Sequence, residues 1–115
     1  MNTTIFHNPR CSKSRQTLEL LNENGVSPEI VKYLETPPSA EELKDILDML
    51  GISPRELMRK GEAEYKEQGL ADENLTDEEL IMAMVKTPRL IERPIVVKGN
   101  KAALGRPPVA VLDIL

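Results

Sequence analysis

The chain contains few of the residues on which several protein classes depend. Among its 115 residues there is one cysteine, one histidine, one phenylalanine, two tyrosines and no tryptophan. A lone cysteine excludes an internal disulfide, so any redox cycle must take its second thiol from another molecule. One cysteine and one histidine cannot supply the ligands of a zinc site, and we expect no bound metal. The core must be mainly aliphatic.

Long apolar runs and nucleotide-binding motifs are also absent. No apolar run approaches the ~18 residues that span a bilayer, and no signal-peptide pattern opens the chain. We therefore expect a cytoplasmic protein without membrane contact, a compartment in which an unpaired cysteine stays reduced. A sequence pI of about 5.1 argues against nucleic-acid binding. Neither a phosphate-binding Gly-x-x-x-x-Gly-Lys-Ser/Thr loop nor a Gly-x-Gly-x-x-Gly fingerprint occurs.

Acidic residues are missing from the start of the chain, where none precedes Glu19. This region contains the stretch His7-Asn8-Pro9-Arg10-Cys11-Ser12-Lys13-Ser14-Arg15, with the only cysteine and the only histidine. The stretch lies between a β-type run, residues 3–7, and an amphipathic helical run that ends at Asn24-Gly25. Free backbone N–H groups and the helix dipole favour a thiolate at a helix start, and they also favour a bound oxyanion.

Each polar residue of this stretch has a functional and a structural interpretation. Cys11 is either an inert buried thiol or a catalytic thiolate, and its position among cations favours the thiolate. His7 either tunes the ionisation of Cys11 or is a hydrogen-bonded structural group. Ser14 either donates a hydrogen bond to the thiolate or caps the first helical turn. Three cations are expected to give electrostatic support: Arg10, Lys13 and Arg15. A cysteine-dependent phosphatase loop needs an arginine six residues after its cysteine. Here that position, 17, is threonine, so this class of enzyme is excluded.

The first third of the chain is predicted to form a βαβ unit, from residues 3–7, the helix after Cys11 and a strand over residues 29–34. A helical insertion is predicted over about residues 39–88. Three capping boxes, each a hydroxyl followed three residues later by a glutamate, open its helices: Ser39 with Glu42, Ser53 with Glu56, and Thr76 with Glu79. The second helix is expected to run to about Lys60-Gly61, with a weaker helical piece over residues 62–68.

The last third is predicted to be ββα. Two β-type runs, residues 90–98 and 101–104, are joined by Gly99-Asn100, a pair typical of a tight hairpin. A final helix is expected after Gly105-Arg106-Pro107-Pro108. Its predicted apolar face consists of Pro108, Val111, Leu112 and Leu115.

The order β-α-β, helices, β-β-α is that of the thioredoxin layout with an insertion between its halves. We therefore expect an α/β, thioredoxin-like fold: a four-stranded mixed sheet flanked by helices, in a single domain over residues 1–115. In this layout a reactive cysteine starts the first helix. Pro94 would occupy the position of a cis-proline that faces this cysteine.

Five segments together resemble the glutaredoxin-dependent arsenate reductases, in order and over essentially the whole chain: His7-Asn8-Pro9-Arg10-Cys11, Tyr33-Leu34-Glu35-Thr36-Pro37-Pro38, Glu56-Leu57-Met58-Arg59-Lys60, Glu92-Arg93-Pro94-Ile95-Val96-Val97 and Gly105-Arg106-Pro107. The resemblance implies that Cys11 is the catalytic cysteine and that His7 helps to ionise it. It also implies that Arg59, Arg93 and Arg106 bind the oxyanion. The structural interpretation of each arginine is a surface cation.

The resemblance also implies an activity. The Cys11 thiolate would attack arsenate or a similar oxyanion, with glutathione as co-substrate, glutaredoxin as redox partner and no bound cofactor, in arsenic detoxification. Two alternatives stay open. One is a non-enzymatic regulatory or partner-binding protein of the same fold, related to regulators that bind RNA polymerase, and the other is a thiol reductase with another substrate.

Overall fold

The computed structural model describes residues 2–115 and divides into two compact units. The first comprises Met1–Thr36, of which the structure describes residues 2–36, together with Arg93–Leu115. The second is Pro37–Glu92 and contains the predicted helical insertion. The single domain over residues 1–115 stays a prediction.

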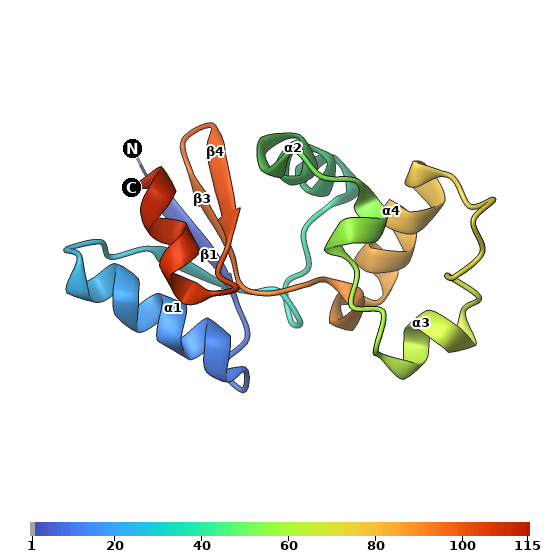
Figure 1. Ribbon diagram of the computed structural model, residues 1–115, viewed down its shortest axis with the longest axis horizontal. Helices are drawn as coiled ribbons and strands as arrows, with labels where there is room; N and C mark the ends of the chain where they lie inside the picture. The colour runs from blue at the N-terminus through green and yellow to red at the C-terminus, as the bar shows by residue number, and fades with distance from the viewer. Residues whose placement is uncertain (1) are drawn as a thin grey trace. The chain divides into compact units, whose positions relative to one another are not determined.

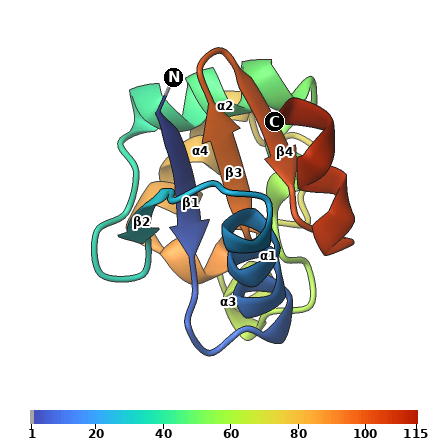
Figure 2. The same cartoon turned by 90° about the vertical axis from the view of Figure 1, so that its left-hand side faces the viewer.

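The first unit is built on a four-stranded mixed sheet (Figure 1, Figure 2). Its strands are β1 (Thr3–His7), β2 (Glu29–Lys32), β3 (Ile95–Lys98) and β4 (Lys101–Leu104), in the order β2-β1-β3-β4. β1 pairs in parallel with β2 and antiparallel with β3, which pairs antiparallel with β4. The helix α1 (Ser12–Glu23) makes the crossover that parallel neighbours need. The predicted βαβ and ββ halves are therefore confirmed.

The strand β2 is shorter than the predicted run of residues 29–34. It ends at Lys32 because the Lys32 carbonyl accepts hydrogen bonds from the N–H groups of Glu35 and Thr36, both at 2.9 Å. These bonds close a turn, so the chain leaves the sheet two residues earlier than its β-type composition indicates.

The turn between β3 and β4 consists of Gly99 and Asn100. Gly99 has a φ of +60°, a conformation that glycine adopts without steric cost and that two-residue hairpin turns require. The hairpin brings its two ends together, and the Gly105 N–H donates to the Pro94 carbonyl at 2.9 Å.

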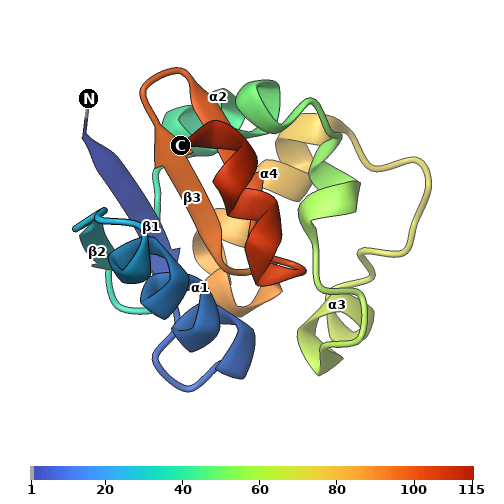
Figure 3. The same ribbon diagram turned by 60° about the vertical axis from the view of Figure 1, so that its left-hand side comes forward.

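One face of the sheet is covered by α1 and by the C-terminal 3-10 helix η3 (Pro108–Ile114), as Figure 3 shows. The centre of this core consists of four fully buried side chains, one from each of β1, α1, β3 and η3: Ile5, Leu21, Val96 and Val111. All are aliphatic, as the scarcity of aromatic residues predicts. This core fixes α1 against the sheet, and with it the start of the helix.

The C-terminal helix differs from the prediction in its period. A 3-10 helix has three residues per turn, so side chains three positions apart align. Val111 is fully buried and Ile114 packs against the core, three residues later. Leu112 and Leu115 are 38% and 37% exposed. The predicted apolar face, which assumed an α-helical period, is wrong at these two leucines.

The second unit is helical (Figure 1). It contains α2 (Ala40–Leu50), the 3-10 turn η1 (Pro54–Leu57), α3 (Ala63–Glu67), α4 (Asp77–Lys86) and the 3-10 turn η2 (Pro88–Leu90). All three predicted capping boxes are present at the starts of α2, η1 and α4. In each, the hydroxyl accepts a backbone N–H three residues ahead and the glutamate accepts the N–H of the capping residue, which satisfies donors that the helix leaves free.

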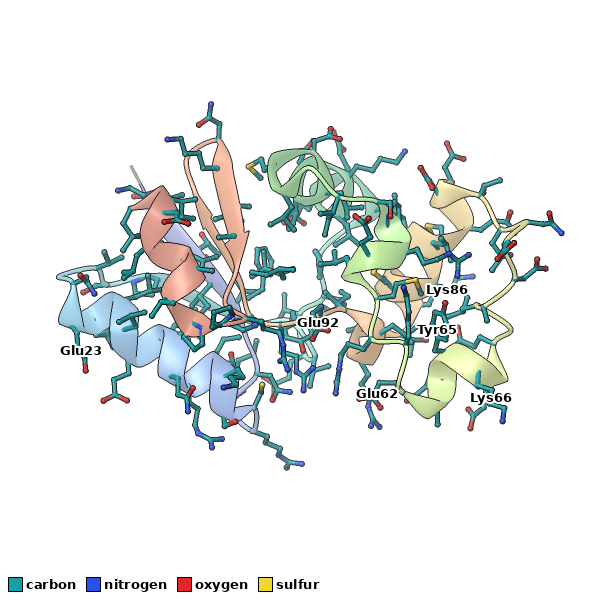
Figure 4. All side chains as sticks on the ribbon, in the orientation of Figure 1. Glu23, Glu62, Tyr65, Lys66, Lys86 and Glu92 are labelled. Carbon is teal, nitrogen blue, oxygen red and sulfur yellow. The ribbon has the colours of Figure 1, made fainter. Side chains whose placement is uncertain are left out.

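The helix α3 has five residues and is held by Tyr65, which is 8% exposed and points into the unit, whereas Lys66 points away from it (Figure 4). The Tyr65 hydroxyl lies 2.8 Å from Arg55 Nη1.

Among residues 2–115, no helix combines the length and the apolar character that crossing a membrane requires.

The 3-10 turn η1 ends at Leu57, so the helix predicted to continue to about Lys60-Gly61 is wrong. Met58 is extended and forms an isolated antiparallel bridge with Ile91. Pairing with a distant segment takes precedence over the local helix signal here, because the backbone groups that would continue the helix are used across the bridge.

The same pairing explains why β3 is shorter than the predicted run of residues 90–98. The Glu92 N–H donates to the Leu57 carbonyl at 2.8 Å, and the Arg59 N–H donates to the Leu90 carbonyl at 2.7 Å. Leu90 belongs to the 3-10 turn η2, and Ile91 and Glu92 pair with residues 57–59 inside the second unit. This part of the predicted run therefore lies outside the main sheet.

Candidate active site

Cys11 is the N-cap residue of α1 and follows the loop that leaves β1. Its N–H donates to the Asn8 carbonyl at 3.0 Å, and its carbonyl accepts the N–H of Arg15 at 3.0 Å, the first hydrogen bond of the helix. The loop is thus closed by a tight turn that holds the cysteine at the carboxyl end of a central strand, the edge at which α/β sheets bind ligands. Cys11 is 9% exposed.

The surroundings of Cys11 favour its ionised form. Burial raises the pKa of the thiol and is the largest single influence, but four others oppose it and together outweigh it. In decreasing order they are the backbone N–H of Ser14, the charge of Arg93, the backbone N–H of Lys13 and the charge of Arg106. The pKa of Cys11 therefore lies below its ordinary value, as a nucleophilic thiolate requires.

Arg93 and Arg106 stand at the two ends of the β3–β4 hairpin. Arg106 Nη1 donates a hydrogen bond to the Arg93 carbonyl at 3.2 Å, which ties the two segments together. The Arg93–Pro94 peptide bond, at the candidate cis-proline, is cis, and so is the Arg106–Pro107 bond. The structure thus brings two of the three predicted oxyanion-binding arginines to the same thiol.

Arg59, the third, lies in the second unit between η1 and α3. Its Nη2 pairs with Glu62 Oε1 at 2.6 Å, and its Nη1 donates to the Arg89 carbonyl at 3.4 Å. Glu62, labelled at the start of α3 in Figure 4, also pairs with Arg89 at 3.4 Å. The role of Arg59 in oxyanion binding stays a prediction.

His7 and Ser14 form a buried pair beside the loop. Ser14 is fully buried and His7 is 6% exposed. Ser14 Oγ lies 2.6 Å from His7 Nδ1 and accepts the N–H of Asn8 at 3.1 Å. The described hydrogen bonds of the Ser14 hydroxyl thus go to His7 and the loop, whereas its backbone N–H acts on Cys11. The sequence left two roles open for this hydroxyl, a hydrogen bond to the thiolate or a cap of the first helical turn, and the contact with the Asn8 N–H is neither of them.

The pKa of His7 lies below its ordinary value, first because of burial and then because of the positive charges of Lys32 and Arg15. The imidazole is therefore neutral near pH 7, and its Nδ1 can accept the hydroxyl proton of Ser14. Lys32 was not predicted to influence the site. It reaches His7 because the parallel register pairs these two residues at the ends of β2 and β1, a relation that no local pattern reveals.

The three predicted supporting cations act in different ways. Arg15 Nη1 donates to the Pro9 carbonyl at 2.9 Å and so braces the loop. Lys13 lowers the pKa of Cys11 through its backbone N–H. Arg10 is exposed and lines a cavity of about 280 Å³ together with Lys32. The side-chain charges that lower the pKa of the thiol come instead from the far end of the chain.

The chemical groups of this site suit a tetrahedral oxyanion. A buried thiol with a lowered pKa lies among backbone N–H donors and two guanidinium groups, which are planar paired donors for oxygen atoms. Within residues 2–115, no group of three or more histidine, cysteine, aspartate or glutamate side chains is placed to hold a metal ion.

Comparisons with known proteins give one consistent family. The profile of the ArsC family matches residues 6–114. The chain is 62% identical over 112 residues to the uncharacterized protein YfgD of Escherichia coli (strain K12). The matched region covers 96% of this chain and 94% of that protein. It is 55% identical over 104 residues, 90% of this chain and 89% of the relative, to a protein of Neisseria meningitidis serogroup A named arsenate reductase.

A solved structure is also similar. The arsenate reductase from Vibrio cholerae matches with a TM-score of 0.97 and 52% sequence identity, over 100% of this chain and 98% of that chain. This likeness confirms the thioredoxin-like fold class that the order of elements predicts.

Proposed function

Because the chain belongs to the ArsC family, we propose that it is an arsenate reductase with Cys11 as its nucleophile. One observation carries the proposal: the pKa of Cys11 is lowered in part by the charges of Arg93 and Arg106. A thiolate beside two guanidinium groups is suited to attack an oxyanion. Relatives named arsenate reductase, at 55% and 52% identity, support arsenate as that oxyanion.

In the first step the Cys11 thiolate attacks the arsenic of arsenate. A sulfur–arsenic bond forms, and one arsenate oxygen leaves as water after protonation. Both reactants are negatively charged, so the repulsion between them must be offset in a partly desolvated site. Arg93 and Arg106 do so with fixed charges and parallel donors, and Arg59 is the predicted third ligand of the oxyanion.

Reduction of arsenate to arsenite takes two electrons, and the chain has one thiol. Glutathione supplies the other. Its thiolate attacks the Cys11 sulfur, so that a disulfide forms and the electron pair of the sulfur–arsenic bond leaves with arsenite. Glutaredoxin and a second glutathione then reduce the Cys11–glutathione disulfide and release oxidised glutathione. The cycle needs no bound cofactor, and it belongs in the cytoplasm, where glutathione keeps thiols reduced.

The test is turnover by the purified chain with arsenate, glutathione, glutaredoxin and glutathione reductase, with arsenite measured directly. The control is Cys11→Ser, and parallel reactions omit glutathione or glutaredoxin. We expect arsenite only when the parent chain and both thiol components are present. If the parent forms no arsenite although Cys11 titrates as a low-pKa thiol, the proposal fails, and a regulatory protein or a reductase of another substrate is favoured.

A further inference from the structure

The backbone of Gly105 lies against α1 with no space for a side chain. A Cβ atom at this position would overlap Thr17 Oγ1, and it would lie 2.7 Å from Pro94 Cγ and 3.1 Å from Thr17 Cγ2. Real Cβ atoms essentially never come within 3.0 Å of such neighbours. Gly105 is not among the glycines with positive φ, so it is required for space and not for its backbone conformation.

Other glycines of the chain do not share this constraint. A Cβ atom added at Gly25, Gly51, Gly61 or Gly69 would have nothing within 4 Å. Gly61 also lacks a positive φ, so alanine fits there in both space and conformation. The contact at Gly105 is therefore a specific feature of the hairpin's end.

This contact joins the hairpin to the helix. The Gly105 N–H donates to the Pro94 carbonyl at 2.9 Å. On the helix side, Thr17 Oγ1 donates to the Lys13 carbonyl at 2.8 Å and lies 3.5 Å from the Gly105 carbonyl. Thr17 is fully buried, so its side chain has no room to move away from an added atom.

The joined segments are the ones that carry the charged groups of the site. Arg93 directly precedes Pro94, Arg106 directly follows Gly105, and Cys11 caps the helix to which Thr17 belongs. We propose that Gly105, packed on Thr17, is a positioning residue that holds Arg93 and Arg106 at the Cys11 thiolate. It acts through the arginines and touches no substrate. The inference rests on the proposed oxyanion-binding role of these arginines, but its test does not require turnover of arsenate.

The substitution Gly105→Ala should act on Cys11 by changing the distance between the arginine charges and the sulfur. A methyl group at Gly105 must displace either the arginine-bearing segments or the side chains against which they pack, and the energy between two charges falls as they separate. The expected consequence is a weaker positive potential at the sulfur and a higher pKa of Cys11. A glycine needed only for packing would change stability without changing either quantity.

The experiment compares Gly105→Ala with the matched control Gly61→Ala. Iodoacetate is an anion and iodoacetamide is neutral, and both alkylate a thiolate. The ratio of their rate constants, measured where Cys11 is fully ionised, therefore reports the positive potential at the sulfur, and the pH dependence of the iodoacetamide rate gives the pKa. We expect Gly105→Ala to lower the ratio about threefold or more and to raise the pKa, because both depend on nearby cations. Gly61→Ala should match the parent.

Two further variants test the positioning role without relying on Gly105→Ala alone. In Gly105→Ala with Thr17→Ala, both threonine contacts disappear, and we expect the ratio to recover in part. Thr17→Ala alone loosens the same contact without adding an atom. It should lower the ratio even if Gly105→Ala does not fold.

The inference is overturned if folded Gly105→Ala keeps the ratio and the pKa of Gly61→Ala. It is also overturned if Gly105→Ala does not fold and Thr17→Ala leaves the ratio unchanged. Absence of arsenate turnover in the parent would sink the proposed function and leave this measurement intact, so the two failures are distinguishable.

Discussion

Ser14 Oγ lies 2.6 Å from His7 Nδ1 in a buried contact between the end of β1 and the first turn of α1. Because the pKa of His7 is lowered, first by burial, the pair is a hydrogen bond between neutral groups near pH 7. The same hydroxyl accepts the N–H of Asn8. It therefore links the first turn of α1 both to the end of β1 and to the loop that leads to Cys11. These contacts favour the structural interpretation of His7, and its role in ionising Cys11 stays a prediction.

Ser14→Ala removes this connection and leaves the Nδ1 of His7 and the N–H of Asn8 without their described partner. We expect a loss of about 1–3 kcal/mol in the free energy of unfolding, the cost of unsatisfied buried polar groups. Urea unfolding measures this loss. Ser12→Ala, at an exposed position of the same helical turn, is the control. Equal stability of the two variants would contradict the prediction.

The ionisation of Cys11 makes stability depend on pH. Its pKa is lower in the folded chain than in the unfolded chain, so between the two pKa values the unfolded state binds more protons and stability rises with pH. The contribution is complete above the unfolded pKa and is lost as pH falls through the folded pKa. We expect the free energy of unfolding of the parent, relative to Cys11→Ser, to be larger at about pH 9 than at about pH 5. A difference that does not vary with pH would rule this out.

Lysine in place of Arg93 or Arg106 keeps the charge but loses the planar pair of donors. We expect each variant, Arg93→Lys and Arg106→Lys, to lower arsenate turnover by a factor on the order of ten, about 1.4 kcal/mol, with little change in thermal stability. Arg89→Lys, at a side chain that is 60% exposed in the second unit, is the control. Full activity of both site variants would mean that charge alone suffices.

The proposed cycle passes through a disulfide between Cys11 and glutathione. When the chain is treated with arsenate and glutathione and no glutaredoxin, intact mass spectrometry should show one glutathione per chain, because Cys11 is its only thiol. Cys11→Ser should carry none. Sustained turnover with thioredoxin as the sole reductant, without any glutathione adduct, would require another route.

The 3-10 period of η3 leads to a prediction about stability. Val111 is fully buried and Leu112, the next residue, is 38% exposed. Val111→Ala should therefore destabilise the chain by about 1–3 kcal/mol, whereas Leu112→Ala should cost less than about 0.5 kcal/mol. Thermal unfolding of both variants measures the difference. Equal costs would indicate that the helix has an α-helical period in solution.

Local features of the fold were predictable because their causes lie within a few residues. The capping box of Ser39 and Glu42 and the turn at Gly99 each follow from short-range hydrogen bonding and backbone conformation. The bridge between Met58 and Ile91 was not predictable, because distant backbone groups compete with the local helix signal and prevail.

The candidate site divides in the same way. The N-cap position of Cys11 is a local property, and it was read from the strand and helix on either side. The pairing of Lys32 with His7 depends on strand register, and the need for glycine at position 105 depends on contact with Thr17. A single sequence does not indicate that a glycine is required because a distant side chain leaves no space for a Cβ atom.

The antiparallel pairing of β1 with β3, in which Thr3 lies opposite Lys98, has a consequence for the chain during its synthesis. β1 leaves the ribosome before β3, which follows only after the whole of the second unit. Until then β1 has a partner on one side alone, and its other edge offers free backbone groups to any strand nearby. The helices of the second unit form from local contacts meanwhile, because contacts of low sequence separation form fastest. The nascent species most exposed to wrong pairing is therefore a chain with folded helices and an open β1 edge.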